Sequence, residues 1–267
     1  MDNKHALIRR TSPRLADGLL THRAREAVDM DLAQRQWDDY VAVLHDNGWR
    51  TTEVEPIAEC PDSVFVEDTV VVYGDLAVIT RPGADERKPE TAATERAVRA
   101  LGYRVAHIQA PGTLDGGDVL KSHGRVWVGR GGRTNREGVR QLRELLEEFG
   151  AETIEVPIEK VLHLKSAVTA LPDGTVLGYP PVVDDPTVYG DAFMPVPEET
   201  GAIVVSLGGN KLIMQASAPD SIEIMRGKGY DVTVVDVSEF EKLEGCITCL
   251  SVRLRGVDTS SAGRPKR

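Results

Sequence analysis

The stretch DTVVVYGDLAVIT (residues 68–80) consists of an apolar β-rich run, a short turn that contains Gly74, and a second apolar run. This pattern predicts a β-hairpin, because β-branched residues favour strands and glycine adopts the backbone conformations of tight turns. The same pattern recurs in DVLKSHGRVWVG (118–129) and SAVTALPDGTVLGY (166–179). The turn glycines Gly74, Gly124 and Gly174 are spaced 50 residues apart, so the chain carries an internal repeat.

A second recurring feature is a helical stretch that ends at a glycine and is followed by a short strand. Glycine just past a helix end adopts the left-handed conformation that closes the helix. The clear copies of this feature are NGWRTTEVEP (47–56), LGYRVAHIQAP (101–111), EFGAETIEVP (148–157) and KGYDVTVVDV (228–237). The stretch EETGAIVVSL (198–207), around Gly201, is interpreted as a degenerate copy of it with a poor helix.

The repeating unit is therefore strand–strand–helix–strand, present about five times in one α/β domain over residues 1–255. Periods of 20–50 residues indicate arrays or propellers, and repetition about an axis can close a ring. The C-terminal run 246–256 is a lone strand, and HALIRR (5–10) is its expected partner, which would close an α/β propeller. An open α/β sheet is the weaker alternative, because hairpins imply antiparallel pairs. Residues 256–267 are small and polar and predict a flexible tail.

Composition and charge exclude several classes of function. The 267 residues are 41% apolar and 28% charged, as in ordinary globular proteins. The net charge of −10 argues against a nucleic-acid partner and mildly favours cationic ligands. No apolar run is long enough for a membrane span, and the N-terminus has no signal-peptide core, so we expect a cytoplasmic location. The sequence leaves the oligomeric state open, a homodimer included.

Several carboxylates are expected to gather at one mouth of the ring. Asp68 and Asp118 each stand six residues before a turn glycine, so their positions in the repeat match. Asp62, Glu67 and Asp115 are close to them in the sequence. Like charges packed together are unfavourable unless a cation compensates them, and a metal or a cationic substrate could do so. The alternative is a purely structural role, in which these residues stabilise turns and helix caps, as Asp often does in loops.

A histidine and the cysteines are the other candidates for chemistry. His163 lies in an apolar strand-like run, where it is either a core residue or an acid/base group. Cys249 precedes an apolar strand, and a buried cysteine there is either structural or a thiolate nucleophile. The three cysteines, Cys60, Cys246 and Cys249, argue against a disulfide framework. The Cys246–Cys249 spacing is disfavoured as a redox or zinc motif, because its flanks are strand-like and no second pair exists.

Several local motifs together resemble the dimethylarginine dimethylaminohydrolases, a family of the guanidine-modifying (pentein) superfamily. The motifs are PDSVFVEDT (61–69), ITRPGA (79–84), GTLDGGDVL (112–120), RTN (133–135), HLKSAV (163–168) and TCLSVRL (248–254). They run in order from the first quarter of the chain to its end, so the resemblance covers essentially the whole sequence. It implies a five-bladed α/β propeller, which agrees with the repeat.

The resemblance also implies roles for individual residues. It makes Cys249 the nucleophile, His163 the general acid/base and Asp115 the carboxylate that orients the histidine. The other implied residues bind substrate: Asp62 and Asp68, with Glu67 beside them, at the guanidinium; Arg87 and Arg133 at the amino-acid carboxylate; Leu20 on a lid; and Phe65 on the pocket wall.

The activity implied by the resemblance is hydrolysis of Nω-methylated arginine to citrulline and dimethylamine or methylamine. The reaction would pass through a covalent thiouronium on cysteine and would need no metal and no organic cofactor. Arginine deiminase-type hydrolysis of free arginine, or of another guanidino compound, is the first alternative. A protein that binds methylarginines without turnover is the second.

Overall fold

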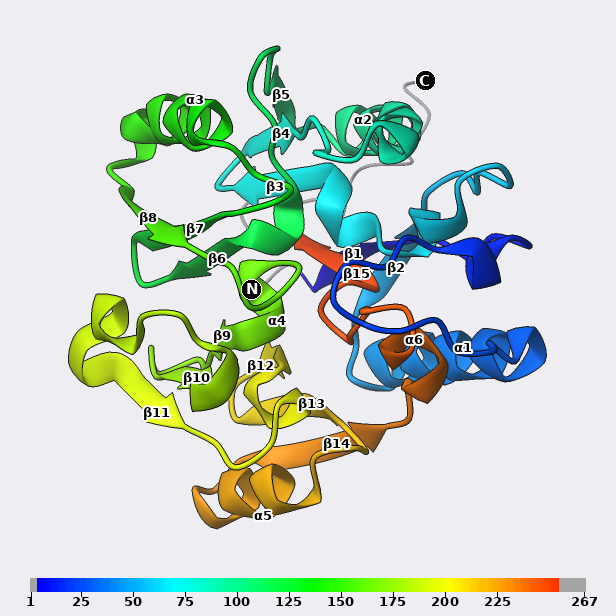
Figure 1. Ribbon diagram of the computed structural model, residues 1–267, viewed down its shortest axis with the longest axis vertical. Helices are drawn as coiled ribbons and strands as arrows, with labels where there is room; N and C mark the ends of the chain where they lie inside the picture. The colour runs from blue at the N-terminus through cyan, green and yellow to red at the C-terminus, as the bar shows by residue number, and fades with distance from the viewer. Residues whose placement is uncertain (1–3, 255–267) are drawn as a thin grey trace, which may run out of the picture.

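The computed structural model describes residues 4–254, whose strands form five three-stranded sheets around a central axis (Figure 1). In every sheet the middle strand pairs antiparallel with one neighbour and parallel with the other. The sheets are β15 (Ser251–Leu254), β1 (His5–Ile8) and β2 (Arg50–Glu53); β3 (Val70–Tyr73), β4 (Leu76–Ile79) and β5 (Arg104–His107); β6 (Val119–Ser122), β7 (Arg125–Arg130) and β8 (Glu152–Pro157); β9 (Val168–Ala170), β10 (Val176–Gly178) and β11 (Phe193–Pro195); and β12 (Val204–Gly208), β13 (Lys211–Gln215) and β14 (Asp231–Val235). The predicted α/β propeller is confirmed.

Helices connect the middle and parallel strands on the outside of the ring. Four sheets use an α-helix for this connection: α1 (Met30–Asp46), α2 (Thr91–Ala100), α3 (Arg136–Leu146) and α5 (Pro219–Gly227). In the fourth sheet the connection runs through the 3₁₀ helices Pro180–Val182 and Pro186–Ala192, since its prolines cannot continue an α-helix. Two short helices, α4 (Leu164–Ala167) and α6 (Ser238–Glu241), lie nearer the axis (Figure 1).

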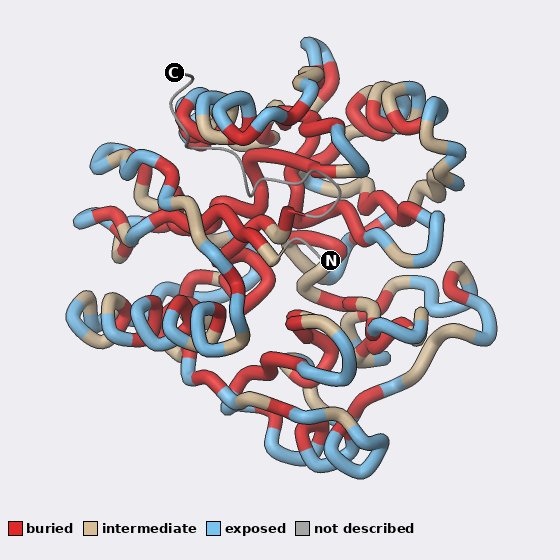
Figure 2. The backbone as a smooth tube through the Cα atoms, turned by 180° about the vertical axis from the view of Figure 1, so that it is seen from behind, coloured by how far each residue is buried: buried red, intermediate tan, exposed pale blue. Residues whose placement is uncertain are grey.

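The ring closes where the first described strand pairs with the last, as the sequence predicts. Strand β1 pairs antiparallel with β15, in a register that sets His5 opposite Leu254 and Ile8 opposite Ser251. The turn glycines Gly74, Gly124 and Gly174 all have positive φ, which confirms the three hairpin turns of the repeat. Buried residues line the inner strands, while the exposed residues lie mostly on the outer helices and loops (Figure 2). The hydrophobic core therefore lies where adjacent sheets meet.

The interpretation of residues 198–207 as a helix–glycine–strand copy is wrong. The run after Gly201 is β12, which opens the fifth hairpin and pairs antiparallel with β13. The strand that completes the fourth sheet is the shorter β11, which lies earlier in the chain. A side chain at Gly201 would collide with Ser221, since a Cβ there would lie 1.9 Å from the Ser221 Oγ. This glycine serves close packing against α5 and not a helix end.

No helix within residues 4–254 has the length and apolar character needed to cross a membrane. The division into a catalytic domain over residues 1–255 and a separate tail stays a prediction. The predicted tail, residues 256–267, lies outside the described residues.

Candidate active site

A small cavity near the axis collects residues from widely separated parts of the chain. Its volume is about 20 Å³, which is room for about one water molecule. Seven of the predicted site residues line it: Asp62, Phe65, Asp68, Arg87, Arg133, His163 and Cys249. Short 3₁₀ segments deliver several of them, Pro61–Val64 and Val66–Thr69 among them, because these tight turns stand directly before a hairpin strand.

His163 is held between two buried carboxylates. Its Nε2 lies 3.0 Å from Oδ2 of Asp115, and its Nδ1 lies 3.7 Å from Oδ1 of Asp68. Burial opposes a charge on the ring, but Asp68, Asp115 and Asp118 outweigh it and raise the pKa of His163 to about 9. The ring is therefore an imidazolium at neutral pH. It can donate a proton to a group that enters the cavity.

Two adjacent glycines allow these groups to approach so closely. A Cβ on Gly116 would lie 2.0 Å from the carbonyl oxygen of Glu67. A Cβ on Gly117 would lie 2.7 Å from both Asp68 Oδ1 and His163 Nδ1. Without side chains, the segment packs against the 3₁₀ helix Val66–Thr69, and the Gly117 N–H donates to Asp68 at 2.9 Å. The GGD motif thus has a packing role besides a turn role.

Asp115 and Asp118 are anchored on either side of that glycine pair. Asp115 accepts a hydrogen bond from the Gly83 N–H at 2.9 Å. Asp118 accepts from the Leu164 N–H at 2.9 Å and from the Thr134 hydroxyl at 2.5 Å. Burial raises the pKa of Asp118 to about 6, against the opposing effect of His163. Both carboxylates are fully enclosed. Asp118 therefore supports the first turn of α4, directly after His163.

Asp68 and Arg87 form a buried ion pair. The Arg87 Nη1 lies 2.5 Å from Asp68 Oδ2, and the same guanidinium donates to both carboxylate oxygens of Glu90. Its Nη2 also donates to the backbone carbonyls of Asp62 and Phe65. Although burial opposes ionisation of Asp68, His163 and Arg87 hold the pKa of this carboxyl below its usual range. The hydrogen bonds of the Arg87 guanidinium are thus made to residues around the cavity.

Arg133 is the freer of the two predicted arginines. Its side chain is largely enclosed, and within residues 4–254 its closest charged partner is Asp115, with Nη1 and Oδ2 3.9 Å apart. This contact is a long ion pair, beyond hydrogen-bond distance. Because the guanidinium lines the cavity and its ion pair is long, it is available to bind a further anion.

A loop is fastened over the cavity by two carboxylates. The Leu19 N–H donates to both oxygens of Asp62, at 3.3 and 3.0 Å. Glu244 accepts from three successive N–H groups, those of Thr21, His22 and Arg23, at 3.0, 2.5 and 2.7 Å. Residues 18–23 form what is called the lid below. Burial raises the pKa of Asp62, against the opposing effects of Arg87 and the Leu19 N–H.

The lid differs in detail from the sequence-based prediction. Leu20 is half-buried, and its neighbour Leu19 is the leucine that lines the cavity. The sequence analysis did not single out Glu244, because one acid in the string KLEGC carries no spacing or motif. Its positive φ of 59° marks an unusual backbone position that only the folded chain shows.

Cys249 lies in a tight turn that follows α6. The Cys249 N–H donates to the Cys246 carbonyl at 3.0 Å, and the two sulfurs lie 3.3 Å apart. The Cys246 sulfur, burial, and the carboxylates of Glu67 and Asp68 raise the pKa of Cys249 well above its ordinary value. The Cys249 sulfur is therefore a thiol when the cavity is empty. A cation bound beside it would favour the thiolate.

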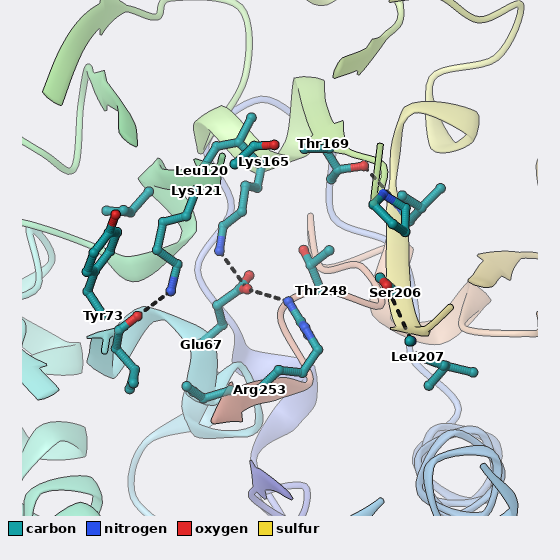
Figure 3. A pocket seen from close by; sticks show the side chains of 18 of the residues that line it. Glu67, Tyr73, Leu120, Lys121, Lys165, Thr169, Ser206, Leu207, Thr248 and Arg253 are labelled. Carbon is teal, nitrogen blue, oxygen red and sulfur yellow. Dashed lines mark hydrogen bonds and ion pairs between the residues drawn. The ribbon is translucent and has the colours of Figure 1, made fainter. Parts of the chain in front are cut away.

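Glu67 faces a different cavity from its neighbour Asp68. Its Oε1 lies 2.6 Å from Lys165 Nζ and 3.4 Å from the Arg253 guanidinium (Figure 3). These three side chains line a large cavity of about 1370 Å³ that shares no lining residue with the small one. Glu67 was predicted beside the substrate carboxylates, but the structure places its side chain on the far side of the 3₁₀ helix Val66–Thr69.

One group of side chains has the spacing of a metal site. Asp68, Asp115 and His163 each offer a ligand atom, and these atoms lie within 4.8 Å of one another. Both nitrogens of His163 face carboxylates, and their charges keep the ring protonated to about pH 9. Since a metal ligand must be a neutral imidazole, this arrangement suits proton transfer better than metal binding.

The ring of five α/β sheets, with a buried thiol and an imidazolium among carboxylates, is typical of the hydrolases of the guanidine-modifying superfamily. Comparisons with known proteins support this class. The chain is 59% identical over 255 residues to an N(G),N(G)-dimethylarginine dimethylaminohydrolase of Streptomyces coelicolor, covering 96% of this chain and 98% of that protein. It is 35% identical to the enzyme of that name from Pseudomonas aeruginosa, covering 94% and 99% of the two chains. The chain therefore belongs to the dimethylarginine dimethylaminohydrolase family.

Solved structures agree with the sequence relatives. A cysteine-to-serine variant of the Pseudomonas aeruginosa enzyme in complex with citrulline superimposes with a TM-score of 0.88 at 34% identity, covering 95% of this chain and 100% of that one. A structure of a dimethylarginine dimethylaminohydrolase adduct with S-methyl-L-thiocitrulline gives a TM-score of 0.87. A search against protein-family models found no match.

Proposed function

We propose that this protein hydrolyses Nω-methylated arginine, both asymmetric dimethylarginine and monomethylarginine, to citrulline and dimethylamine or methylamine. The observation that carries the proposal is the small cavity in which Cys249, His163, Asp62 and Asp68 meet. These groups match what a guanidinium substrate requires, namely two carboxylates, a nucleophile and a proton donor. The names of the two relatives describe hydrolysis of N(G),N(G)-dimethylarginine with loss of dimethylamine, which supports the first of these substrates. The proposed site of action is the cytoplasm.

Binding begins with the charge of the substrate. A guanidinium is planar and cationic, and Asp62 and Asp68 accept its N–H groups in charge-assisted hydrogen bonds. The burial-raised pKa of Asp62 returns toward its ordinary value when this cation arrives. The Arg133 guanidinium binds the carboxylate of the free amino acid. Arg87 can share that task only by giving up one of its bonds to Asp68, Glu90 or the backbone carbonyls, so its first role is to position Asp68.

The same cation activates the nucleophile. Cys249 is a thiol in the empty site because its pKa is raised by Cys246, burial and the nearby carboxylates. A guanidinium beside the sulfur reverses that balance and favours the thiolate. The thiolate then attacks the central carbon of the guanidinium. Fixed proximity makes this attack effective on an otherwise poor electrophile.

His163 moves the protons of both half-reactions. As an imidazolium, it protonates the departing amine while the bond from carbon to the methylated nitrogen breaks, leaving a thiouronium on Cys249. The neutral ring then removes a proton from water, whose attack on the thiouronium carbon releases citrulline. Asp115 holds the ring through Nε2 and stabilises its charge. The proposed steps use no metal and no organic cofactor.

The closed cavity requires the lid to open for binding. A space of about 20 Å³ admits about one water and no amino acid. Substrate entry therefore breaks the bonds from Leu19 to Asp62 and from the lid to Glu244. Reclosure excludes water, which strengthens the electrostatic interactions inside.

The test is turnover of three substrates in separate reactions: asymmetric dimethylarginine, arginine and agmatine. The ureido product (citrulline, or N-carbamoylputrescine from agmatine) and the released amine or ammonia are measured for the wild type and for Cys249→Ser. We expect dimethylamine and citrulline from the methylated substrate, with a loss of about 10⁴-fold or more in the variant. Comparable ammonia release from arginine would move the protein to deiminase chemistry. No turnover of any substrate by the folded wild type would contradict the proposal.

A further inference from the structure

Two buried cysteines stand within reach of a covalent bond. Cys246 and Cys249 lie in one turn, and their sulfurs are 3.3 Å apart. The hydrogen bond from the Cys249 N–H to the Cys246 carbonyl closes this turn and brings both side chains to one side of it. A disulfide has an S–S length near 2.05 Å, so the sulfurs need to approach by about 1.3 Å. Side-chain rotation within the turn can supply that movement.

The two sulfurs differ in access. Cys249 lines the small cavity under the lid, whereas Cys246 is not among its lining residues. Both cysteines belong to an apolar cluster with Phe240 and Leu250, and of the two only Cys249 also lines the cavity. A small oxidant that enters the cavity therefore meets Cys249 first. The Cys246 thiol, 3.3 Å from the Cys249 sulfur, is then the nearest group that can reduce an oxidised Cys249.

We propose that Cys246 and Cys249 are a reversible oxidative modification site, at which a hydroperoxide oxidises Cys249 and Cys246 captures it as an intramolecular disulfide. The proposal rests on the proposed function of Cys249 as the nucleophile. Its consequence is that Cys246 protects Cys249 from irreversible oxidation. The sequence alone disfavoured a redox role because the flanks are strand-like, but residues 246–249 form a turn in the structure and β15 begins only at Ser251.

The chemistry balances with a hydroperoxide as oxidant. The Cys249 sulfur attacks one peroxide oxygen and the O–O bond breaks. The thiol proton passes to the leaving oxygen, which departs as an alcohol or water, and Cys249 becomes a sulfenic acid. The Cys246 sulfur then attacks the Cys249 sulfur, an S–S bond forms, and the sulfenic oxygen leaves as water. Two thiols lose two electrons in total, and the hydroperoxide gains them. A dithiol reverses the step by thiol–disulfide exchange and is itself oxidised to a disulfide.

The surroundings of Cys246 favour the second step. Hydrogen bonds from the Cys249 thiol and from the Thr248 hydroxyl, whose oxygen lies 3.2 Å from the Cys246 sulfur, lower the pKa of Cys246 although burial opposes this. A thiolate is the attacking form in disulfide formation. Cys60, the third cysteine, lies in a different region, where its sulfur contacts the Glu86 carbonyl. It is therefore a matched control.

The experiment treats the full-length protein with hydrogen peroxide and follows both covalent state and activity. Peptide mapping without reductant is expected to show a Cys246–Cys249 disulfide, with Cys60 still a thiol. Activity on asymmetric dimethylarginine is expected to fall and to return after dithiothreitol. Each protein is scored against its own untreated activity. In Cys246→Ser the loss is expected to be irreversible, with sulfinic acid at Cys249, whereas Cys60→Ser recovers like the wild type.

The mapping separates this proposal from the proposed function. A disulfide in a protein that turns over no substrate would sink the proposed function and leave the modification site standing. Wild-type protein that accumulates sulfinic acid at Cys249 beside a free Cys246 thiol would overturn the modification site. Full recovery of Cys246→Ser activity would do the same. If that variant does not fold, mapping of the wild type still decides the question.

Discussion

The two cavities of the ring differ in size and in chemistry although neighbouring residues line both. The small cavity is closed by the lid and contains Cys249 and His163. The large one, about 1370 Å³, has Glu67, Lys165 and Arg253 at its wall and no cysteine among its lining residues (Figure 3). Asp68 directly follows Glu67, and the two side chains serve different cavities.

The charged side chains have different roles in the two cavities. In the small cavity, burial and close carboxylates produce large changes in pKa, which catalysis by acid and base requires. At the large cavity, Lys165 and Arg253 compensate one carboxylate, that of Glu67. The comparison predicts that substitutions one residue apart have unlike effects.

Among the tests of this comparison, the largest effect is expected from the pair Asp68→Asn and Glu67→Gln. Asp68→Asn removes a carboxylate that we propose binds the substrate, and it leaves Arg87 without one of its anions. We therefore expect kcat/KM on asymmetric dimethylarginine to fall about 10²–10³-fold. Glu67→Gln leaves two cations less compensated, so we expect a loss of about 1–3 kcal/mol in the free energy of unfolding and a much smaller loss of turnover.

Kinetics and urea unfolding of both variants measure this pair. Circular dichroism provides the control that each variant is folded. Equal losses of turnover in the two folded variants would mean that Glu67 also acts in the small cavity, and the separation described above would be wrong.

A smaller effect is expected in the pH dependence. The imidazolium of His163 is the proposed proton donor, and its pKa of about 9 lies above the ordinary value of 6.5. The protonated form predominates at neutral pH and disappears as the pH rises through about 9, so kcat is expected to fall on that side. Removing one of the anions that raise this pKa should move the fall to lower pH.

Asp115→Asn is the variant that tests this shift. It keeps the size of the side chain and removes the charge at Nε2 of His163. We expect the alkaline limb of the profile of kcat against pH to move toward neutrality. An alkaline limb that stays in place in an active Asp115→Asn enzyme would show that another group controls it.

The smallest effect is expected at the lid. Glu244→Gln keeps one oxygen acceptor but removes the charge that accepts three N–H groups from Thr21, His22 and Arg23. Hydrogen bonds to a charged group contribute about 1.5–3 kcal/mol, so the closed lid loses part of that stabilisation. We expect KM to rise by about tenfold or less with little change in kcat. Glu241→Gln, in the same segment but with no contact to the lid, is the matched control; an equal rise in KM there would exclude a lid-specific effect.

Local sequence was sufficient to predict the framework of the fold. Turn glycines such as Gly74 and Gly124 set the hairpins, because glycine adopts a positive φ without the steric cost that a side chain brings. The closing strand pair of β1 and β15 followed from one strand without a local partner at each end of the chain. The prediction around Gly201 was wrong because the connection in the fourth sheet contains no α-helix. The helix–glycine–strand pattern was therefore assigned to the next apolar run in the sequence, which is β12.

The candidate site was predicted through motifs, and its geometry was not. The resemblance indicated Cys249, His163 and Asp115. No periodicity in the sequence shows that His163 is held between two carboxylates. Nor does it show that Arg87 forms ion pairs with Asp68 and Glu90. Glu67 and Asp68 look equivalent in the string VFVEDT. Only the tight turn of the 3₁₀ helix points them into separate cavities.

The sequence by itself determined the repeat, the hairpins and the family of this protein, because turn conformations, strand patterns and motifs depend on residues close together in the chain. The tertiary structure decided the charge state of His163, the lid contacts of Glu244 and the meeting of the Cys246 and Cys249 sulfurs. These properties depend on burial and on distances between atoms. Such distances exist only after the five sheets close into a ring.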